Sequence, residues 1–485
     1  MTERRFWTPP PRSVATLAAP SLDGVRRLHL LGMGGAGMRN LARLFVSRGY
    51  AVAGSDMKAS RYLEELAELG VAVHVGHHVD ALGQPDVVVV SSAIQSSNPE
   101  LVEARRRGIP VWARQQALAA LAAGRRAVAV AGTHGKTTTT SMVAVGLERG
   151  GADPSYLVGG DLNESGSGAR HGDGDLFVFE ADESDGSFLL VPPWIGVITN
   201  VELDHVDFYP GGLPEIRAAF TEFAASCRQV IACGDDPHVR EVIARSGARA
   251  TCYGFDPSND IVVRSVSLGP DGARGVVSFA TVSEGSASIA EVRVSLRVDG
   301  PHNLLNAAAA IAVAREAGIE PATAADALGA FDGVHRRFEL RGRARGAEFF
   351  DDYGHNPTEM AVTVATARRR DPRRLIALVQ PHRHSRVRAM WRELGASVAS
   401  ADLVIVTDVY AAAQEPIPGV SGKLVVDGVQ LAAPGIRTVY LPHRADVVAF
   451  LDREIRPGDL VVTMGCGDVW MLGDAAIERI RNGDA

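Results

Sequence analysis

The stretch VAVAGTHGKTTTTS, Val128 to Ser141, decides how the rest of the chain is interpreted. Val128 to Ala131 are apolar and suit a buried strand, while the residues from Lys136 onward suit a helix. A strand, a glycine turn and a helix that begins at Lys-Thr form a phosphate-binding loop, because backbone N–H groups at the helix start surround phosphate oxygens. The Lys136 ammonium then reaches the terminal phosphates, and the Thr137 hydroxyl holds Mg²⁺. The stretch therefore predicts ATP-dependent chemistry.

The loop has the short spelling G-T-x-G-K-T, Gly132–Thr137, because Val130 occupies the position of the first glycine in the longer form. The competing interpretation is a glycine turn with an incidental lysine. Lysine scarcity argues against it, since the chain contains only Lys58, Lys136 and Lys423 among 50 basic residues. Where arginine has replaced lysine almost everywhere, a lysine that remains is expected to do something that arginine cannot.

The composition indicates a globular protein with about three domains, since the chain has 485 residues, of which 46% are hydrophobic and 22% charged. A net charge of −7 gives no reason to expect nucleic acid or an anionic membrane as partner. The four cysteines fall at no metal-binding spacing and are interpreted as free thiols in a reducing compartment. Residues 1–20 contain no apolar run and are predicted to form a disordered leader. We expect a cytoplasmic protein without membrane insertion.

Residues 21–124 alternate apolar runs with helical patterns and predict a parallel α/β domain. After the first run, Gly32, Gly34 and Gly37 form G-x-G-x-x-G before a helix, and Asp56 ends the next run. This pattern is typical of a dinucleotide site, with the pyrophosphate at the helix start and the aspartate on a ribose hydroxyl. It does not distinguish NAD from other conjugates of a nucleoside diphosphate.

A second α/β unit, residues 125–333, begins with the ATP loop. Two of its apolar runs end in acidic clusters: one closes on Glu180 within EADESD, and the other is followed by Glu202, Asp204 and His205. Ligands of parallel sheets bind beyond the carboxyl ends of the strands, so these acids are predicted to surround the nucleotide phosphates. A solvated acidic loop is the alternative. Residues 260–298 alternate apolar and polar side chains and predict an antiparallel insertion.

An alanine-rich helix is predicted after Gly300, with His302, Asn303 and Asn306 in its first turns. These side chains either hold an adenine ring and ribose or cap the helix, and the sequence leaves both interpretations open.

A third α/β pattern, residues 334–485, follows a predicted hinge at 331–339. Polar residues end its apolar runs: Asp351, Asp352, Tyr353 and His355 after the first, His382, Arg383, His384 and Arg386 after the second, and Asp408 after the third. Two arginines after a strand suit a carboxylate, which guanidinium groups bind through two parallel hydrogen bonds. A solvated basic loop is the alternative. The glycine-rich segment 464–470 is interpreted as a packing turn.

Together, the motifs resemble those of the Mur ligase family from about residue 25 onward. The elements that carry the resemblance are LGMGGAGM, VVSSAI, AGTHGKTTT, EADESD, TNVELDHVD, PHNLLNAAAA, GVHRRFE, DDYGHNPTE, QPHRHSR, DVYAAAQEPIPG and MGCGDVW. Asn356 stands where the family usually has a second histidine, and His384 where an aromatic residue is usual. No catalytic role is predicted for either.

The resemblance implies three domains: an N-terminal Rossmann-like domain for a UDP-sugar, a central P-loop ATPase and a C-terminal Rossmann-like domain for an amino acid. It also implies a reaction of peptidoglycan precursor synthesis. ATP phosphorylates the lactyl carboxylate of UDP-N-acetylmuramate, and the amine of L-alanine attacks the acyl phosphate. The implied metal is Mg²⁺, with Mn²⁺ as a substitute, and the protein is expected to be a monomer or a homodimer.

The resemblance also assigns residues to sites. The catalytic residues are Lys136, His205 and His355. The ATP site comprises Gly132, Thr133, His134, Gly135, Lys136, Thr137, Thr138, His302, Asn303, Asn306 and Arg337. The UDP-sugar site comprises Gly32, Gly34, Gly35, Gly37, Asp56, Ser91 and Ser92. The amino-acid site comprises Tyr353, His382, Arg383 and Arg386, and the metal ligands are Thr137, Glu180 and His205.

Three other functions compete with this one. The nearest is a ligase that attaches a recycled peptide to the same nucleotide sugar, or one that prefers glycine or serine. An NAD-dependent dehydrogenase would explain residues 21–124 alone, but not an ATP loop in the same chain. A non-catalytic sensor of the nucleotide sugar would require eroded catalytic positions, whereas Lys136, Glu180 and His205 are all present.

Overall fold

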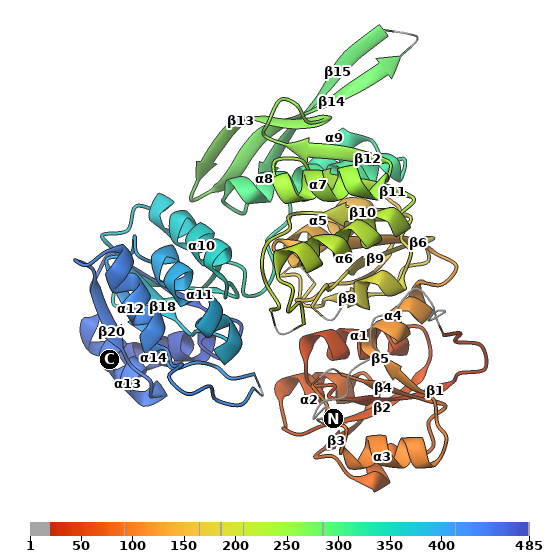
Figure 1. Cartoon of the computed structure of the whole chain (residues 1–485), viewed down its shortest axis with the longest axis horizontal. Coiled ribbons are helices and arrows are strands. Elements are labelled where there is room, and N and C mark those ends of the chain that lie inside the picture. The colour runs from red at the N-terminus through yellow and green to blue at the C-terminus, as the bar shows by residue number, and fades with distance from the viewer. Residues whose placement is uncertain are drawn as a thin grey trace.

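The computed structural model describes residues 20–483 except 92, 164, 185–186, 207, 284–285 and 413. Within this part the chain forms three sheets, one inside each of the ranges 21–124, 125–333 and 334–485, and the predicted α/β fold is confirmed (Figure 1). The predicted leader, up to residue 19, and Ser92 lie outside the described residues. No described helix is long and apolar enough to cross a membrane.

The N-terminal sheet is parallel with the order β3-β2-β1-β4-β5. Its strands are β1 (Arg27–Leu31), β2 (Ala51–Asp56), β3 (Ala72–Val75), β4 (Val87–Val90) and β5 (Val111–Ala113). Its helices are α1 (Ala36–Ser47), α2 (Arg61–Glu68), the short η2 (Val79–Leu82), α3 (Pro99–Arg106) and α4 (Arg114–Ala122). The strand β4 is four valines, all buried, as expected for a strand covered on both faces.

The central sheet has the order β15-β14-β13-β12-β11-β10-β6-β9-β7-β8. Its strands are β6 (Arg126–Ala131), β7 (Ser155–Leu157), β8 (Ala169–Arg170), β9 (Leu176–Glu180), β10 (Ile195–Ile198), β11 (Gln229–Cys233), β12 (Ala250–Gly254), β13 (Ile261–Gly269), β14 (Gly272–Ser283) and β15 (Ser286–Leu296). Its helices are α5 (Lys136–Arg149), the short η3 (Ser187–Leu190), α6 (Leu213–Ser226), α7 (Pro237–Ser246), α8 (Pro301–Glu316) and α9 (Pro321–Leu328). The segment predicted as an antiparallel insertion forms β13, β14 and β15, and it extends this sheet because β13 pairs with β12.

The C-terminal sheet has the order β16-β17-β21-β18-β19-β20, and only β16 is antiparallel to its neighbour. Its strands are β16 (Glu339–Ala344), β17 (Ala347–Asp352), β18 (Arg374–Val379), β19 (Leu403–Val406), β20 (Arg437–Tyr440) and β21 (Asp459–Met464). Its helices are α10 (Pro357–Arg369), α11 (His384–Ser397), α12 (Lys423–Ala432), α13 (Arg444–Glu454) and α14 (Trp470–Gly483). In the glycine-rich turn after β21, the Gly465 N–H donates to the carbonyl of Asp352 at 3.1 Å, and the Gly465 carbonyl accepts from Arg336 at 2.6 Å. These bonds agree with a packing turn.

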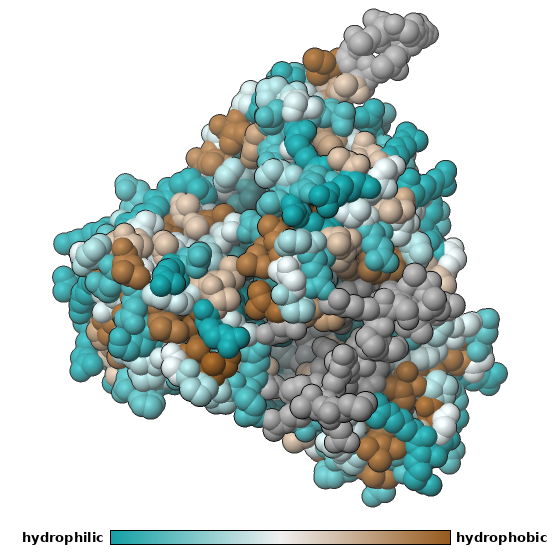
Figure 2. Space-filling view, in the orientation of Figure 1, coloured by the Kyte–Doolittle hydropathy of each residue, from teal (hydrophilic) through white to brown (hydrophobic). Residues whose placement is uncertain are grey.

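Polar contacts join the central domain to both neighbours. On the N-terminal side, Arg39 donates to Asp161 at 2.6 Å and Asn40 to the carbonyl of Val158 at 3.1 Å. On the C-terminal side, Arg386 forms a buried ion pair with Asp204 at 2.7 Å. Hydrophobic side chains on the face drawn in Figure 2 are scattered among hydrophilic ones, so this face has no single large apolar patch outside the grey residues.

Candidate active site

The phosphate-binding loop lies between β6 and α5, where the sequence predicts it. Gly132 is required at its position, since its φ is +141° and an added Cβ would lie 2.0 Å from the Thr199 hydroxyl oxygen. Asn200, after β10, fixes the loop from the same side: its amide oxygen accepts from the His134 N–H at 2.8 Å, and its amide nitrogen donates to the His134 carbonyl at 3.0 Å. The neighbouring strand end therefore sets the shape of the loop.

The lysine of the loop is held by a carboxylate. The Lys136 Nζ lies 2.9 Å from the Glu183 Oε1 and also donates to the carbonyls of Gly132 at 2.6 Å and Thr133 at 3.2 Å. Burial alone would lower the pKa of Lys136, but the surrounding carboxylates, Glu183 first, outweigh it and raise the pKa above its ordinary value. The ammonium is therefore charged, as binding of phosphate requires.

Acidic side chains surround this lysine. Thr137 donates to Glu180 at 3.0 Å, while Asp182, Glu183 and His205 have ligand atoms within 4.8 Å of one another. One oxygen of Glu183, Oε2, is buried without a hydrogen-bond partner. Burial, with repulsion from Asp182, outweighs the attraction of Lys136 and raises the pKa of Glu183 to about 7. A buried carboxylate oxygen without a donor, among other oxygen ligands, fits a hard divalent cation such as Mg²⁺ or Mn²⁺.

The three metal ligands expected from the sequence belong to two separate contacts. Thr137 contacts Glu180, whereas His205 lies 3.7 Å from Glu183. Glu183 and Asp182 are not among the predicted ligands, although both stand in the acidic run that follows β9. Glu183 occupies the central position because it contacts both Lys136 and His205.

The predicted adenine residues lie at the start of α8, which packs against α5. The N-cap of α8 is Gly300, without a side-chain cap bond, but the Asn303 amide donates to the Asp299 carbonyl at 2.7 Å and so holds the helix start. The adenine role of His302, Asn303 and Asn306 stays a prediction. Asn306 accepts from the Thr139 hydroxyl at 3.0 Å, which places it against the phosphate loop helix. Burial lowers the pKa of His302 to about 4, so its ring is neutral at pH 7. Thr138 is half-buried in the first turn of α5.

The first glycine loop, between β1 and α1, is closed by Asp56. The Asp56 Oδ2 accepts from the Gly34 N–H at 2.9 Å, and a Cβ on Gly34 would lie 2.9 Å from the same oxygen. The other oxygen accepts from the Lys58 N–H at 3.2 Å. Asp56, predicted to bind a ribose hydroxyl, therefore holds backbone N–H groups in this structure. Gly35 is the exposed N-cap of α1, and Ser91 directly follows β4, beside Gly32.

Arg114 connects the two loops and is not among the residues predicted from the sequence. It begins α4, and a Cβ on Gly37 would lie 2.8 Å from one of its guanidinium nitrogens. Another nitrogen lies 3.5 Å from the Asp182 carboxylate. The guanidinium therefore stands between the loop after β1 and the acids around Lys136. No local sequence signal marks it, because its two contacts come from other segments of the chain.

The predicted amino-acid residues meet at the carboxyl ends of β17 and β18. The ring centroids of Tyr353 and His355 are 5.8 Å apart, and those of His355 and His382 are 5.6 Å apart. Arg386 donates to the His382 Nδ1 at 3.1 Å and to Asp204 at 2.7 Å. Burial and nearby cations lower the pKa of His355 to about 4 and that of His382 to about 2, so both rings are neutral at pH 7.

Neighbouring residues shape this end of the site. Arg383 is the N-cap of α11 with a φ of +64°, and its N–H donates to the Tyr410 carbonyl at 2.9 Å. Asn356 caps α10 by accepting from the Glu359 N–H, and its amide lies 3.0 Å from the His134 Nδ1. Arg337 donates to the Thr137 hydroxyl at 3.2 Å. Asn356 and Arg337 therefore connect the C-terminal domain to the phosphate loop. His384 is buried at the start of α11.

Comparison with known proteins identifies the family. Models of the Mur ligase family match residues 27–126 (Mur ligase family, catalytic domain), 130–314 (Mur ligase middle domain) and 336–467 (Mur ligase, glutamate ligase domain). The UDP-N-acetylmuramate–L-alanine ligase of Mycobacterium sp. (strain JLS) is 44% identical over 477 residues, which cover 95% of this chain and 96% of the relative. The chain belongs to the Mur ligase family.

Solved structures are similar along the same length. The UDP-N-acetylmuramate-alanine ligase of Thermotoga maritima is 27% identical with a TM-score of 0.77, and 94% of this Mur ligase aligns with 99% of that chain. A murein peptide ligase from Psychrobacter arcticus is 26% identical with a TM-score of 0.72, over 94% and 99% of the two chains. The predicted three-domain Mur ligase fold is confirmed.

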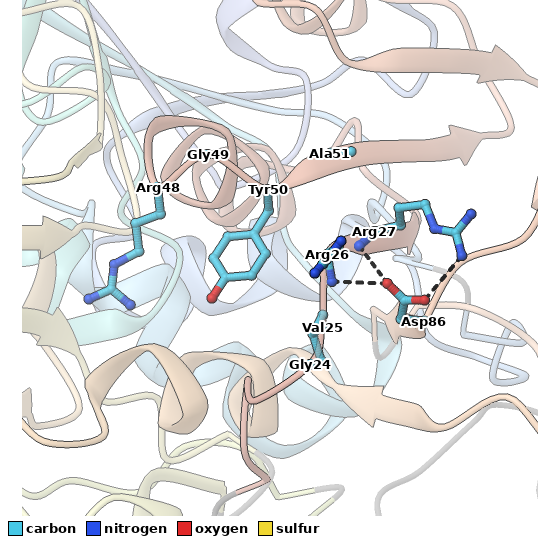
Figure 3. A pocket seen from close by; sticks show the side chains of 9 residues that line it. All are labelled: Gly24, Val25, Arg26, Arg27, Arg48, Gly49, Tyr50, Ala51 and Asp86. Carbon is cyan, nitrogen blue, oxygen red and sulfur yellow. Dashed lines mark hydrogen bonds and ion pairs between the residues drawn. The ribbon is translucent and has the colours of Figure 1, made fainter.

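A hollow of about 620 Å³ lies near the start of β1 in this Mur ligase, at the end of the N-terminal sheet opposite to the glycine loop (Figure 3). Its carboxylate, Asp86, accepts from the backbone N–H groups of Arg26 and Arg27 and from the Arg27 side chain. Because β1 begins at this end and its glycine loop is at the other, the hollow is not part of the site described above.

Proposed function

We propose that this Mur ligase catalyses the ATP-dependent ligation of L-alanine to the lactyl carboxylate of UDP-N-acetylmuramate, with release of ADP and phosphate. The observation that carries the proposal is that both neighbouring domains reach the phosphate site: Arg114 lies 3.5 Å from Asp182, Arg337 donates to Thr137, and Arg386 pairs with Asp204. The names of relatives more than 40% identical along nearly the whole chain support the choice of substrates.

The order of the domains suggests how the substrates are arranged. The loop after β1 would hold the UDP pyrophosphate on backbone N–H groups, so that the sugar extends toward Arg114 and the acids beyond it. The loop after β6 would hold ATP, with Lys136 on its terminal phosphates and Asn303 and Asn306 at the nucleoside. The carboxylate of the sugar then attacks the terminal phosphate to form an acyl phosphate. Positioning and charge neutralisation supply most of the rate enhancement in such transfers.

A divalent cation would be held by Glu180, Glu183, His205 and the Thr137 hydroxyl, with Mg²⁺ as the expected ion and Mn²⁺ as a substitute. When bound, such an ion neutralises negative charge on the phosphate oxygens. Lys136 adds a second positive charge at the same place and remains protonated throughout, because the acids around it raise its pKa.

The amino acid would bind at the ends of β17 and β18. Arg386 suits its carboxylate, because a guanidinium forms two parallel hydrogen bonds with such a group. In this structure the Asp204 carboxylate occupies that place, accepting from two nitrogens of Arg386 at 2.7 and 3.2 Å. His355 is neutral at pH 7 and close to His382, so it is positioned to accept a proton from the amine during attack on the acyl phosphate.

One assay tests the proposal. Phosphate release is measured with UDP-N-acetylmuramate, ATP and Mg²⁺, and with alanine, glycine, serine or the peptide L-alanyl-γ-D-glutamyl-meso-diaminopimelate as the amine. We expect the highest kcat/KM with L-alanine. A higher value with the peptide would identify a recycling ligase, and no release with any amine would reject the proposal. Thermal protection by UDP-N-acetylmuramate, but not by NAD, separates the proposal from a dehydrogenase.

A further inference from the structure

Two groups of side chains in the described part of the chain bring three possible metal ligands within 4.8 Å of one another. The first, Asp182 with Glu183 and His205, belongs to the phosphate site. The second group is His355, His382 and Cys466. We propose that this second group binds a zinc ion, or another soft divalent cation, and that the bound ion competes with L-alanine. The competition rests on the proposed function, whereas the metal site does not.

The fold places these three residues together. His355 follows β17, Cys466 follows β21 and His382 follows β18, and these three strands are parallel neighbours in the order β17-β21-β18. Carboxyl ends of neighbouring parallel strands lie at the same edge about 4.8 Å apart, so side chains that follow three such strands can reach one another. The sheet topology therefore places the three residues at one edge, and their side chains bring the ligand atoms within 4.8 Å of one another.

His355 is oriented as a metal ligand. Its Nδ1 lies 3.1 Å from the carbonyl oxygen of Tyr353, which can only accept, so the Nδ1 carries the proton and donates it. The Nε2 lone pair is then available. A histidine that ligates a metal almost always donates its other ring N–H to a carbonyl or carboxylate, and the Tyr353 carbonyl has that role here.

His382 is shared between the metal and Arg386. Its Nδ1 lies 3.1 Å from the Arg386 Nη1, and a guanidinium only donates, so the Nδ1 accepts in the metal-free protein. A metal on this ring replaces that hydrogen bond or shifts the ring proton, and either change disturbs Arg386. Because Arg386 and both histidines are assigned to L-alanine, metal and amino acid cannot use them together.

The local charges permit a cation. Arg386, Arg336 and Arg383 all act on this group. Carboxylates balance two of them, since Arg386 pairs with Asp204 at 2.7 Å and Arg336 with Asp351 at 2.8 Å. Cys466 adds the charge that a soft cation needs: when the metal–sulfur bond forms, the S–H bond breaks and its proton is released to solvent. The ligand set then carries one negative charge.

The ligand types favour zinc over magnesium. Two imidazole nitrogens and one thiolate form a three-ligand zinc site with an open fourth position. Tetrahedral bonds of about 2.0–2.3 Å require ligand separations of about 3.4–3.8 Å, so the group, whose ligand atoms lie within 4.8 Å, has to close by at most about 1.4 Å. The oxygen-rich group at the phosphate site prefers harder ions, and the two clusters therefore select different metals.

The test of the site needs no substrate. Full-length protein treated with a chelator is titrated with Co²⁺ as a spectroscopic probe, and Zn²⁺ affinity is measured by competition. We expect one tight equivalent, with a thiolate-to-cobalt charge-transfer band in the near ultraviolet. Cys466→Ser should remove the band and weaken Zn²⁺ binding at least ~10-fold, since even loss of an outer hydrogen-bond partner costs that much. Cys252→Ser, at a partly buried cysteine of β12, is the matched control and should retain both.

His382→Ala provides a second variant if Cys466→Ser melts at a lower temperature than the parent. The site is overturned if no thiolate band appears, or if both variants bind Zn²⁺ as tightly as the parent. The competition is tested by phosphate release: Zn²⁺ should raise the KM for L-alanine and leave that for ATP unchanged. A rise in the KM for ATP instead would place the inhibition at the phosphate site and overturn the competition. Absence of any ligase activity would reject the proposed function but leave the cobalt result to decide the site.

Discussion

The loops after β1 and after β6 have the same place in their sheets but differ in what they present there. Each follows an inner strand that has a parallel neighbour on both sides, and each precedes a helix. The loop after β6 brings Lys136 to within 2.9 Å of Glu183, among several acids, whereas the loop after β1 is closed by a backbone bond from Gly34 to Asp56. The same arrangement of strand, loop and helix therefore suits two tasks. The charged lysine in the loop after β6 suits a reaction at a phosphate, whereas the loop after β1, whose backbone can approach a ligand closely, suits binding without a reaction.

The largest expected effect comes from removing the charge at the loop after β6. Lys136→Ala should lower kcat for phosphate release at least ~10²-fold, about 3 kcal/mol, because the variant lacks the positive ammonium beside the transferring phosphate. Binding of UDP-N-acetylmuramate, measured by calorimetry, should hardly change. Lys423→Ala is the matched control, since Lys423 lies on the surface of α12, where it pairs with Asp427. Near-normal turnover in Lys136→Ala would contradict the conclusion that the charge at the loop after β6 serves the reaction.

The reverse result is expected at the loop after β1. Gly34→Val places a branched side chain against the Asp56 carboxylate, 2.9 Å from the new Cβ, and breaks the loop geometry. The KM for UDP-N-acetylmuramate should rise roughly 10- to 100-fold, while that for ATP stays constant. Gly435→Val, at an exposed glycine with open space around it, controls for the added bulk. Equal changes in both constants would indicate a folding defect and remove the contrast.

Arg386 belongs to neither loop, so its substitution should leave the constants of both unchanged. Arg386→Lys keeps the charge but loses the planar pair of donors, and should raise the KM for L-alanine roughly 10- to 30-fold, about 1.4–2 kcal/mol. Trapping of the acyl phosphate should still succeed, because that step precedes amine attack. Arg388→Lys, at an exposed position of the same helix, is the control. Impaired acyl phosphate formation would assign Arg386 to the phosphate site instead.

The smallest effect on turnover is expected from Glu100→Gln, in helix α3 of the N-terminal domain. Glu100 is fully buried and contacts His29, His77 and Ser55 at 2.5–3.2 Å. Burial would raise its pKa, but these hydrogen bonds outweigh it and lower the pKa to about 2. The resulting stability, about 1–3 kcal/mol, is fully present above the ordinary pKa of 4.5 and is lost as the pH falls from 4.5 toward 2.

Acid unfolding followed by circular dichroism checks this. Glu100→Gln should be less stable than the parent at pH 7, and the difference should shrink as the pH falls below 4.5. Glu103→Gln, three residues away on the same helix, makes the same change in a surface ion pair with Arg106 and Arg107 and should have little effect. A difference that grows at low pH would contradict the assignment.

The sequence predicts the parts of this protein whose signal is local. Buried strands followed by glycines, such as Val128 to Ala131 before Gly132, identify both loops, because strand, turn and helix start all lie within a few residues. Order along the chain then gives three α/β units. The bonds from Gly34 to Asp56 and from Lys136 to its own loop carbonyls are consistent with those loops.

The remaining features depend on contacts between distant segments. Arg114 begins an ordinary helix, and only the folded chain brings it to Gly37 and Asp182. The pairing of Arg386 with Asp204 joins residues 182 positions apart in different domains. Glu183 is one of several acids in a single run, and burial beside Lys136 distinguishes it from the others. The roles of these residues can be assigned only from the folded structure, because neither the residue type nor the spacing along the sequence distinguishes them from their neighbours.

The position of β21 in its sheet has a consequence for synthesis of the protein on the ribosome. β17 and β18 each pair with β21 and not with each other, although β21 is the last strand of the chain. While the first two domains emerge as complete folding units, a nascent C-terminal domain lacks the middle of its sheet until residues 459–464 have left the exit tunnel. We therefore expect chains arrested before residue 459 to be protease-resistant up to about residue 333 and sensitive beyond it. A chain cut short by translation failure would bind nucleotides but remain open to degradation at its C-terminal end.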